Sequence, residues 1–180
     1  KYLLGLATAA QSAGARIFEN TPITSFVTKP EKTLTTANGK TIRPKTIVLC
    51  GNAYLGDQAS APMRRRLAHV TSSILATKPL SDNMIKALLP TGAAVADCNA
   101  ALNYYRIDAS GRMIFGGRAS YTNVQIGNLE HDLRRRMEAV FPMLAGVDVD
   151  QIWSGKIGIT VNRIPHFGRT NDDVYFVQGF

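Results

Sequence analysis

The residue types that most often carry enzyme chemistry are few in this sequence and lie far apart. Its histidines are His69, His131 and His166, and no two of them have the spacing that places two metal ligands on one helix face. Its cysteines are Cys50 and Cys98, too few for a four-cysteine zinc site or a secreted disulfide framework. We therefore predict no metal site, structural roles for the histidines, and a reducing, cytoplasmic location.

Motifs that activate a nucleophile or cradle a phosphate are absent from the 180 residues. There is no nucleophile elbow, no P-loop and no Cys-x-x-Cys, which weakens hydrolase, nucleotide-triphosphatase and dithiol interpretations. A Gly-x-Gly-x-x-Gly loop after a strand is missing as well. The pair Gly116-Gly117 lies inside a strand-like stretch, where glycine more often marks the close approach of a backbone or a ligand.

The charge balance favours anionic partners without naming one. The chain has 21 Lys and Arg against 13 Asp and Glu, a formal net charge of +8, which could attract nucleic acid, phosphates or acidic metabolites. Two arginine runs, 64–66 and 134–136, lack the interleaved aromatic residues of a stacking platform for single strands. We interpret both runs as solvated surface, with a nucleic-acid footprint and an anionic substrate funnel as alternatives.

The composition, 45% hydrophobic and 19% charged, suits one ordinary globular domain, and no apolar run is long enough for a membrane helix. Hydrophobic spacing and turn residues predict the elements of the first half. These are a helix with one buried stripe ending at Gly14, extended segments over 15–19 and 24–28, a hairpin over 33–43 turning at Asn38-Gly39, and a strand over 46–50 covered on both faces.

The second half alternates strands with two capped helices. Its predicted elements are a strand over 71–77, a helix from Ser81 through 89, hairpin strands over 102–107 and 112–118, and a helix capped by Asn128. Strands over 149–154, 156–162 and 174–178 follow, and turns at 165–168 and 170–173 lie between the second and the third of them. We expect a mixed α+β fold, with an antiparallel sheet, flanking helices and one parallel element.

Residues 47–56 read IVLCGNAYLG. This stretch resembles the second flavin-contacting strand and turn of the D-amino acid oxidase (DAO) superfamily of FAD-dependent enzymes. The other landmarks, in chain order, are Ala13-Gly14-Ala15, Thr21-Pro22-Ile23, Tyr104-Tyr105-Arg106, Gly116-Gly117, Phe141-Pro142, Leu144, Trp153-Ser154-Gly155, Pro165, Phe167-Gly168 and Gln178-Gly179-Phe180. The resemblance covers nearly the whole chain and implies an oxidoreductase with FAD as cofactor.

The resemblance also implies which parts of such an enzyme are missing. The family begins with the strand, glycine loop and helix that hold the FAD pyrophosphate, and ends with a glycine-rich segment that reaches the flavin ring. We therefore expect an internal fragment that cannot retain FAD alone. Its predicted divisions are part of an FAD-binding domain over 1–55, a substrate domain over 56–162, and a return to the FAD-binding domain over 163–180.

Four motifs are most similar to the branch of the family that oxidises gamma-glutamylputrescine in bacterial putrescine catabolism: 51–57, 97–99, 104–106 and 165–169. The implied reaction is hydride transfer from an amine to the flavin, with oxygen forming peroxide, and the implied partners include neither nucleic acid nor membrane. Amino-acid oxidases of the family carry a carboxylate-clamping arginine shortly after the tryptophan, where this chain has Ile157. A sarcosine- or glycine-type oxidase and a basic nucleic-acid-binding module are the alternatives.

The resemblance assigns site residues one by one and leaves the catalytic residue unknown. Predicted substrate-binding residues are Tyr104, Trp153, Lys156 and Arg118, the last two for the distant glutamyl carboxylate. Predicted cofactor-binding residues are Ile23, Gly51, Asn52, Ala53 and Phe180. Each has a structural alternative: strand aromatics packed in the core, exposed strand charges, or a tight strand exit with no ligand.

Overall fold

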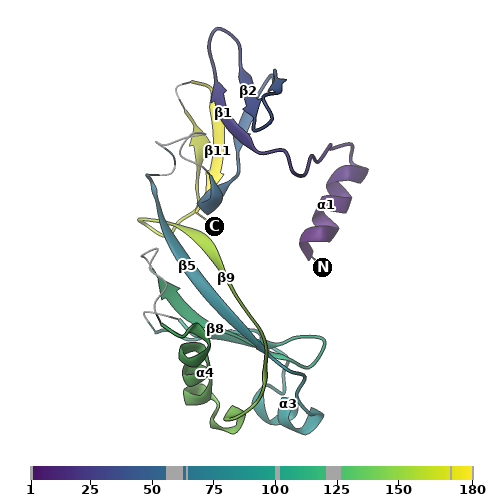
Figure 1. Ribbon diagram of the computed structural model, residues 1–180, viewed down its shortest axis with the longest axis vertical. Coiled ribbons are helices and arrows are strands. Elements are labelled where there is room, and N and C mark those ends of the chain that lie inside the picture. The colour runs from purple at the N-terminus through teal and green to yellow at the C-terminus, as the bar shows by residue number, and fades with distance from the viewer. Residues whose placement is uncertain are drawn as a thin grey trace.

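The computed structural model describes residues 2–55, 63, 65–99, 102–120, 127–170 and 172–179. They form the mixed α+β fold expected from the sequence. Figure 1 shows a long twisted sheet with helices α3 and α4 at one end of the molecule, two small sheets at the other end, and helix α1 set apart beside them.

The largest sheet has five antiparallel strands in the order β6-β7-β8-β5-β9. Its strands are β5 (Leu67–Thr77), β6 (Val95–Ala96), β7 (Tyr104–Ile107), β8 (Met113–Ser120) and β9 (Val149–Thr160). The predicted hairpin of β7 and β8 is confirmed, and Gly111 at its tip has a φ of 78°. The paired strands β5 and β9 extend beyond the rest of the sheet toward the small sheets (Figure 1).

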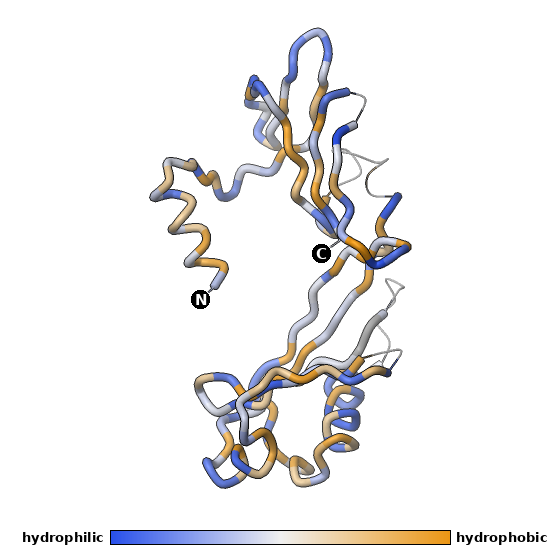
Figure 2. Tube along the Cα trace, turned by 180° about the vertical axis from the view of Figure 1, so that it is seen from behind, coloured by the Kyte–Doolittle hydropathy of each residue, from blue (hydrophilic) through white to orange (hydrophobic). Residues whose placement is uncertain are grey.

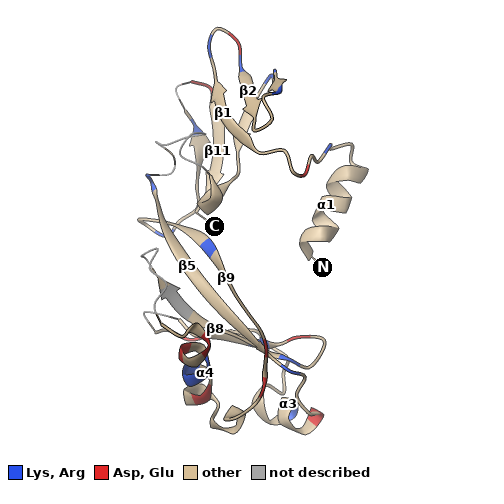
Figure 3. Ribbon diagram, viewed as in Figure 1, with Lys and Arg blue, Asp and Glu red and all other residues tan. Residues whose placement is uncertain are grey.

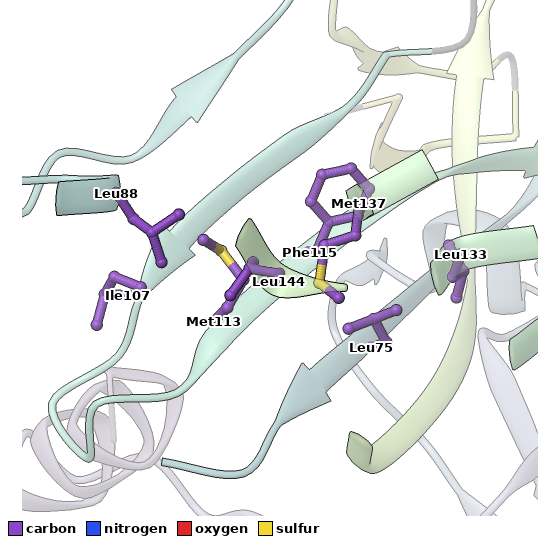
Figure 4. Close-up of a cluster of buried hydrophobic side chains, with 8 residues drawn as sticks. All are labelled: Leu75, Leu88, Ile107, Met113, Phe115, Leu133, Met137 and Leu144. Atoms are coloured by element: carbon purple, nitrogen blue, oxygen red, sulfur yellow. The ribbon is translucent and has the colours of Figure 1, made fainter. Parts of the chain in front are cut away.

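One face of this sheet packs against α3 (Asp82–Leu88), α4 (Leu129–Val140) and the short helix η2 (Pro142–Leu144). Eight buried side chains from these helices and from β5, β7 and β8 form the core drawn in Figure 4: Leu75, Leu88, Ile107, Met113, Phe115, Leu133, Met137 and Leu144. The three- and four-residue spacing of apolar side chains in α4 directs Leu133 and Met137 into this core, as predicted.

Both core helices begin at the predicted caps. The Ser81 side chain accepts a hydrogen bond from the Met84 amide at 3.4 Å, and the Asn128 side chain accepts one from the His131 amide at 3.1 Å. These bonds satisfy amides that have no partner within the helix.

The two small sheets have three strands each. One has the antiparallel order β1-β2-β3, from β1 (Ile23–Val27), β2 (Thr33–Thr36) and β3 (Thr41–Ile42). The other has the order β10-β11-β4, from β10 (His166–Arg169), β11 (Val174–Gln178) and β4 (Ile47–Leu49), with β4 parallel to β11. The parallel element and the Asn38-Gly39 turn, where Gly39 has a φ of 77°, are as expected.

An ion-pair cluster joins these two small sheets. Asp173, in the β10–β11 turn, accepts a hydrogen bond from Lys32 Nζ at 2.8 Å and another from Arg169. Lys32 also donates to the Lys45 carbonyl at 3.0 Å. These hydrogen bonds hold the pKa of Asp173 below its ordinary value.

Two predictions of buried faces are wrong. Helix α1 (Tyr2–Ser12) forms as predicted, but it buries no residue, and Leu3 is 77% exposed. Figure 2 shows apolar residues along this helix. In β4, Ile47 is buried but Val48 is 54% exposed, so this strand is not covered on both faces. Hydrophobic spacing identifies an apolar face, whereas burial requires a second element packed on it.

Three predicted boundaries also differ. Residues 15–19 are not a strand. The predicted turn over 165–168 contains most of β10, which pairs with β11. The strands predicted on either side of Gly155 are the single strand β9, because the ladder with β5 continues through that glycine.

The second arginine run is less exposed than predicted. Arg134 donates to the Val147 carbonyl at 2.5 Å and to Glu130 at 3.1 Å, and Arg136 donates to Asn103 at 3.0 Å. Only Arg135 of this run is exposed. Acidic and basic residues are mixed along α4 (Figure 3), so this helix presents no uniform cationic face.

We expect Leu133→Ala to lower the free energy of unfolding by about 2 to 5 kcal/mol, because it removes a fully buried side chain and leaves a cavity. Arg135→Ala, two residues along the same helix and exposed, is the control and should stay within about 0.5 kcal/mol of the wild type. Urea unfolding followed by circular dichroism measures both. Equal effects of the two variants would contradict the placement of this core.

We expect Asp173→Asn to lower the melting temperature by a few degrees at neutral pH. The pKa of Asp173 is lower in the folded than in the unfolded chain, so its ion pairs stabilise the fold above the unfolded value of about 3.9. This stabilisation is lost as the pH falls through the lowered pKa, and the two melting curves should then converge. Asp172→Asn, at the exposed neighbouring position, is the control. A pH-independent difference would refute the role of the carboxylate.

Candidate active site

A row of paired residues crosses the five-stranded sheet on the face opposite α3 and α4. Tyr104 of β7 pairs with Gly116 of β8, Gly116 pairs with Ile74 of β5, and Ile74 pairs with Trp153 of β9. Paired residues of a ladder point to the same face. Their sequence neighbours belong to the helix-covered core or pack against it, namely Leu75, Tyr105, Phe115 and Ile152. The sheet therefore aligns Tyr104, Ile74 and Trp153 on the other face.

The Tyr104 ring lies across β8. A Cβ atom on Gly116 would be 2.1 Å from Cζ and 2.2 Å from Cε2 of this ring, so only glycine leaves room for it. The Tyr104 hydroxyl reaches β5, where it lies 2.7 Å from Ser72 Oγ. Gly116 and Ser72 thus hold the ring flat on the sheet, a contact that explains the predicted close approach at this glycine.

A second close approach, at Gly117, holds the residue before Tyr104. A Cβ atom on Gly117 would be 2.7 Å from Asn103 Oδ1, which also accepts the hydrogen bond from Arg136. The Asn103 backbone amide and side-chain amide donate to Asp97 at 3.0 and 2.7 Å. Desolvation raises the pKa of Asp97, but the hydrogen bonds from Asn99 and Asn103 outweigh it and keep this pKa below its ordinary value.

Exposed apolar side chains continue the same face along β9. Trp153 and Ile157 are 43% and 45% exposed, and both lie on the side of β9 that Gly155 shares, because alternate residues of a strand share a face. Tyr54, from the short helix η1 (Asn52–Tyr54), accepts a hydrogen bond from the Lys156 amide at 2.9 Å. Its hydroxyl would lie 3.6 Å from a Cβ atom on Gly155. This edge of the sheet therefore gathers Trp153, Ile157 and Tyr54.

The turn after β4 connects the small sheets to β9. Asn52 has a φ of 46°, and its side-chain oxygen accepts a hydrogen bond from the Gly179 amide at 2.9 Å. A Cβ atom on Gly158 would lie 2.4 Å from the same oxygen. The turn, the far end of β9 and the residue after β11 therefore meet at Asn52.

The predicted cofactor residues near this turn have internal contacts. Gly51 has an ordinary φ of −71°, and a Cβ atom on it would lie 3.1 Å from Leu55 Cα, so the close approach there is to Leu55. Ala53 is buried. Ile23 lies in β1, where it pairs with Thr36, and is 37% exposed. The roles of these residues toward a cofactor stay predictions.

The structure brings Tyr104 and Trp153 into one row but does not bring every predicted residue there. Lys156 is exposed, and strand alternation directs its side chain to the opposite side of β9 from Trp153 and Ile157. Arg118 pairs with Ser73 through the backbone, and its side chain lies outside the described residues. Phe180 also lies outside them.

Sequence reasoning missed Ser72, Ile74 and Tyr54 as residues of this face. Ser72 and Ile74 join it through a strand register that no local pattern reveals. Tyr54 had a usable signal, since it directly follows three residues that were assigned to the cofactor turn.

The histidines lie away from this row. His166 is hydrogen-bonded to Gln178 at 3.0 Å and packs against Phe176, and His131 is exposed. His69 lies in β5, and its buried Nε2 has no hydrogen-bond partner among the described residues. Among the described residues, no cluster of three His, Cys, Asp or Glu side chains could hold a metal ion. None of the helices formed by those residues has the length and apolar character needed to cross a bilayer.

The sequence profile of the DAO family, described as FAD dependent oxidoreductase, matches residues 1–180. This chain belongs to that family. It is 31% identical over 177 residues to gamma-glutamylputrescine oxidoreductase of Escherichia coli K12, and 34% identical over 182 residues to the probable oxidoreductase OrdL of Haemophilus influenzae. These matches cover 98% and 99% of the chain but only 41% of each relative, so the chain spans about two fifths of their length.

Solved structures of a dehydrogenase and an oxidase have the same fold. The chain superposes on L-proline dehydrogenase from P. horikoshii with a TM-score of 0.77 and on glycine oxidase from Geobacillus kaustophilus with a TM-score of 0.74, at 19% identity to each. The superpositions cover 97% of the chain and 48% and 46% of those two proteins. The DAO family membership identifies FAD as the cofactor class.

The residues of the sheet face suit the ring end of FAD. The flavin ring is planar and largely apolar, and the face offers partly exposed Trp153 and Ile157 with the aromatic Tyr54 beside them. The sequence has no Gly-x-Gly-x-x-Gly loop to hold the pyrophosphate. The chemistry of this face is therefore compatible with a flavin ring, and the sequence has no Gly-x-Gly-x-x-Gly motif for the phosphates.

Proposed function

We propose that this chain is the substrate-facing part of an FAD-dependent amine oxidase that acts on gamma-glutamylputrescine or a similar amine. The observation that carries the proposal is the row of Tyr104, Ile74 and Trp153 with Ile157 on the same face. The 31% identity to a gamma-glutamylputrescine oxidoreductase supports the substrate class.

Ile157 favours an amine without a neighbouring carboxylate. By the family resemblance, amino-acid oxidases place a carboxylate-clamping arginine at this position. Ile157 shares the face of Trp153 and is 45% exposed, so an apolar side chain stands where a substrate carboxylate would need two hydrogen bonds. Lys156 and Arg118 stay predictions for the distant glutamyl carboxylate.

When bound, FAD would supply the acceptor for a hydride from the carbon next to the amine nitrogen, with oxygen as the final electron acceptor and peroxide as the product. As that C–H bond breaks, the nitrogen lone pair forms the C=N bond, and water then converts the imine to an aldehyde and ammonia. Tyr104 orients the amine through its hydroxyl oxygen. Trp153, Ile74 and Ile157 provide apolar walls that exclude water from the reacting carbon.

We also propose that the chain contributes to two domains of a longer enzyme. Residues 1–55 and 163–180 belong in this proposal to the FAD-binding domain, and residues 56–162 form the substrate domain. The small sheets and α1 lie in the first group, and the exposed apolar residues of α1 and Val48 support the idea that further segments of that domain cover them.

We expect a protein of these 180 residues alone to bind FAD weakly, because a pyrophosphate loop is missing from it. Titration with FAD, followed by flavin fluorescence, should show no saturation at micromolar concentrations. The full-length protein that contains these residues is the control and should retain FAD through gel filtration. Tight binding by the 180 residues, with a quenched flavin spectrum, would contradict this part of the proposal.

We expect the full-length protein with FAD to form peroxide faster with gamma-glutamylputrescine than with glycine or sarcosine. Ile157→Arg should lower the rate with gamma-glutamylputrescine by about tenfold or more, because it puts a charge on an apolar wall, and should make glycine and sarcosine competitive ligands. Val161→Arg adds the same charge at a fully exposed position and is the control. A wild-type preference for glycine or sarcosine would favour the amino-acid oxidase alternative.

A further inference from the structure

The hydroxyl of Tyr104 has one fixed partner in the described part of the sheet. Its oxygen lies 2.7 Å from Ser72 Oγ, and the side chains of both residues are partly buried. The ring cannot move closer to the sheet, because it already lies against Gly116, where a Cβ atom would be 2.1 Å from its Cζ. The position of the phenol oxygen is therefore set by the contact of the ring with Gly116 of β8 and by the hydrogen bond to Ser72 of β5.

The direction of the proton in this pair determines what Tyr104 offers to a substrate. A phenol has one proton to donate and lone pairs that accept. If Tyr104 donates its proton to Ser72, its oxygen is left to accept an N–H from an amine. If the proton is free, it can instead donate to the amine lone pair, which must form the C=N bond during oxidation.

The reaction is slowed when Tyr104 donates to the amine lone pair and is favoured when the Tyr104 oxygen accepts from the amine N–H. A hydrogen bond to the lone pair stabilises the amine before oxidation and is lost as the lone pair enters the C=N bond, so it raises the barrier. A hydrogen bond from the amine N–H to Tyr104 is kept and strengthens as the nitrogen becomes positive. A residue that accepts the hydrogen bond of the Tyr104 hydroxyl would therefore accelerate hydride loss without tightening substrate binding.

We propose that Ser72 is a positioning residue. Its hydroxyl oxygen accepts a hydrogen bond from the Tyr104 hydroxyl, which leaves the Tyr104 oxygen to accept a hydrogen bond from the substrate N–H. The inference rests on the proposed function, and it adds a residue of β5 that acts on the substrate through Tyr104. Ile74, two residues along the same strand, lies on the same row as Tyr104 and adds an apolar side chain to the face that carries this pair.

The test uses the full-length protein with FAD and follows anaerobic bleaching of the flavin by gamma-glutamylputrescine. Ser72→Ala should lower the limiting rate of flavin reduction by about tenfold, the loss expected from one misdirected hydrogen bond, and leave the apparent substrate Kd within about threefold. Ser72→Thr keeps the hydroxyl and should restore most of the rate. A tenfold loss of affinity with an unchanged rate would overturn the proposal.

Tyr104→Phe tests whether Ser72 acts through Tyr104. We expect Tyr104→Phe and the double variant with Ser72→Ala to be equally slow, because two residues that act as one unit are not additive. If Ser72→Ala slows flavin reduction in the Tyr104→Phe background by the same factor as in the wild type, the proposal is overturned.

Ser73→Ala is the matched control. Ser73 is the next residue of β5, and its hydroxyl bonds Ser154 at 2.8 Å, so this variant removes the same kind of cross-strand contact from the other face. It should leave the rate unchanged, with a melting temperature close to that of Ser72→Ala. A rate loss as large as that of Ser72→Ala would indicate a general structural effect and overturn the proposal.

The outcomes separate this inference from the proposed function. If the wild type is bleached by another amine and not by gamma-glutamylputrescine, the proposed substrate is wrong, and the same variants measured with that amine decide the role of Ser72. If the wild type is bleached and Ser72→Ala is equally fast, only the role of Ser72 is wrong. If no amine bleaches the wild type, both are wrong.

Discussion

At the centre of the five-stranded sheet, β8 has two consecutive positions without side chains, Gly116 and Gly117, and the first residue of β7 and the residue before it fill the space over them. The Tyr104 ring occupies the space over Gly116 on one face, and the Asn103 side chain occupies the space over Gly117 on the other. Adjacent residues of one strand thus contact adjacent residues of its neighbour on opposite faces. A side chain at either glycine would force the strands apart or displace the residue above it. The position of Tyr104 depends on this pair of contacts.

The same contacts link the helix-covered core to the opposite face. Asn103 is held by Arg136 of α4 and by Asp97, so the second arginine run contributes to the placement of β7 rather than to a cationic surface. The nucleic-acid interpretation of the run is weaker as a result, because Arg134 and Arg136 already donate hydrogen bonds within the chain and both are half-buried.

Local chemistry in the sequence was enough to predict much of the fold. Ser81 and Asn128 cap their helices because their side chains bond the amides of the first turn, and Asn38-Gly39 turns because glycine accepts a positive φ. The exposure of α1 and of Val48 could not be predicted in this way. Spacing shows which side of an element is apolar, but only the three-dimensional arrangement shows whether another element covers it.

The candidate site was predictable only where the family resemblance reached it. Tyr104 and Trp153 came from motifs, and Gly116-Gly117 gave a signal of close approach without naming the group that approaches. Ser72 and Ile74 could not be found, because their membership depends on the register of β5 against β8 and β9, which joins residues some thirty to eighty positions apart. Such pairings are set by the whole sheet and leave no trace in a local pattern.

The composition of the row bears on the protonation of the substrate. Its side chains are two aromatic residues, Tyr104 and Trp153, and the aliphatic Ile74, and Arg106 lies two residues from Tyr104 on the same side of β7. Apolar surroundings and a nearby cation both disfavour an ammonium ion, so they lower the pKa of a bound amine. Hydride loss requires the neutral amine, because only a free lone pair can form the C=N bond. In the proposed enzyme this environment favours release of the ammonium proton to water, so the row needs no side chain that acts as a general base.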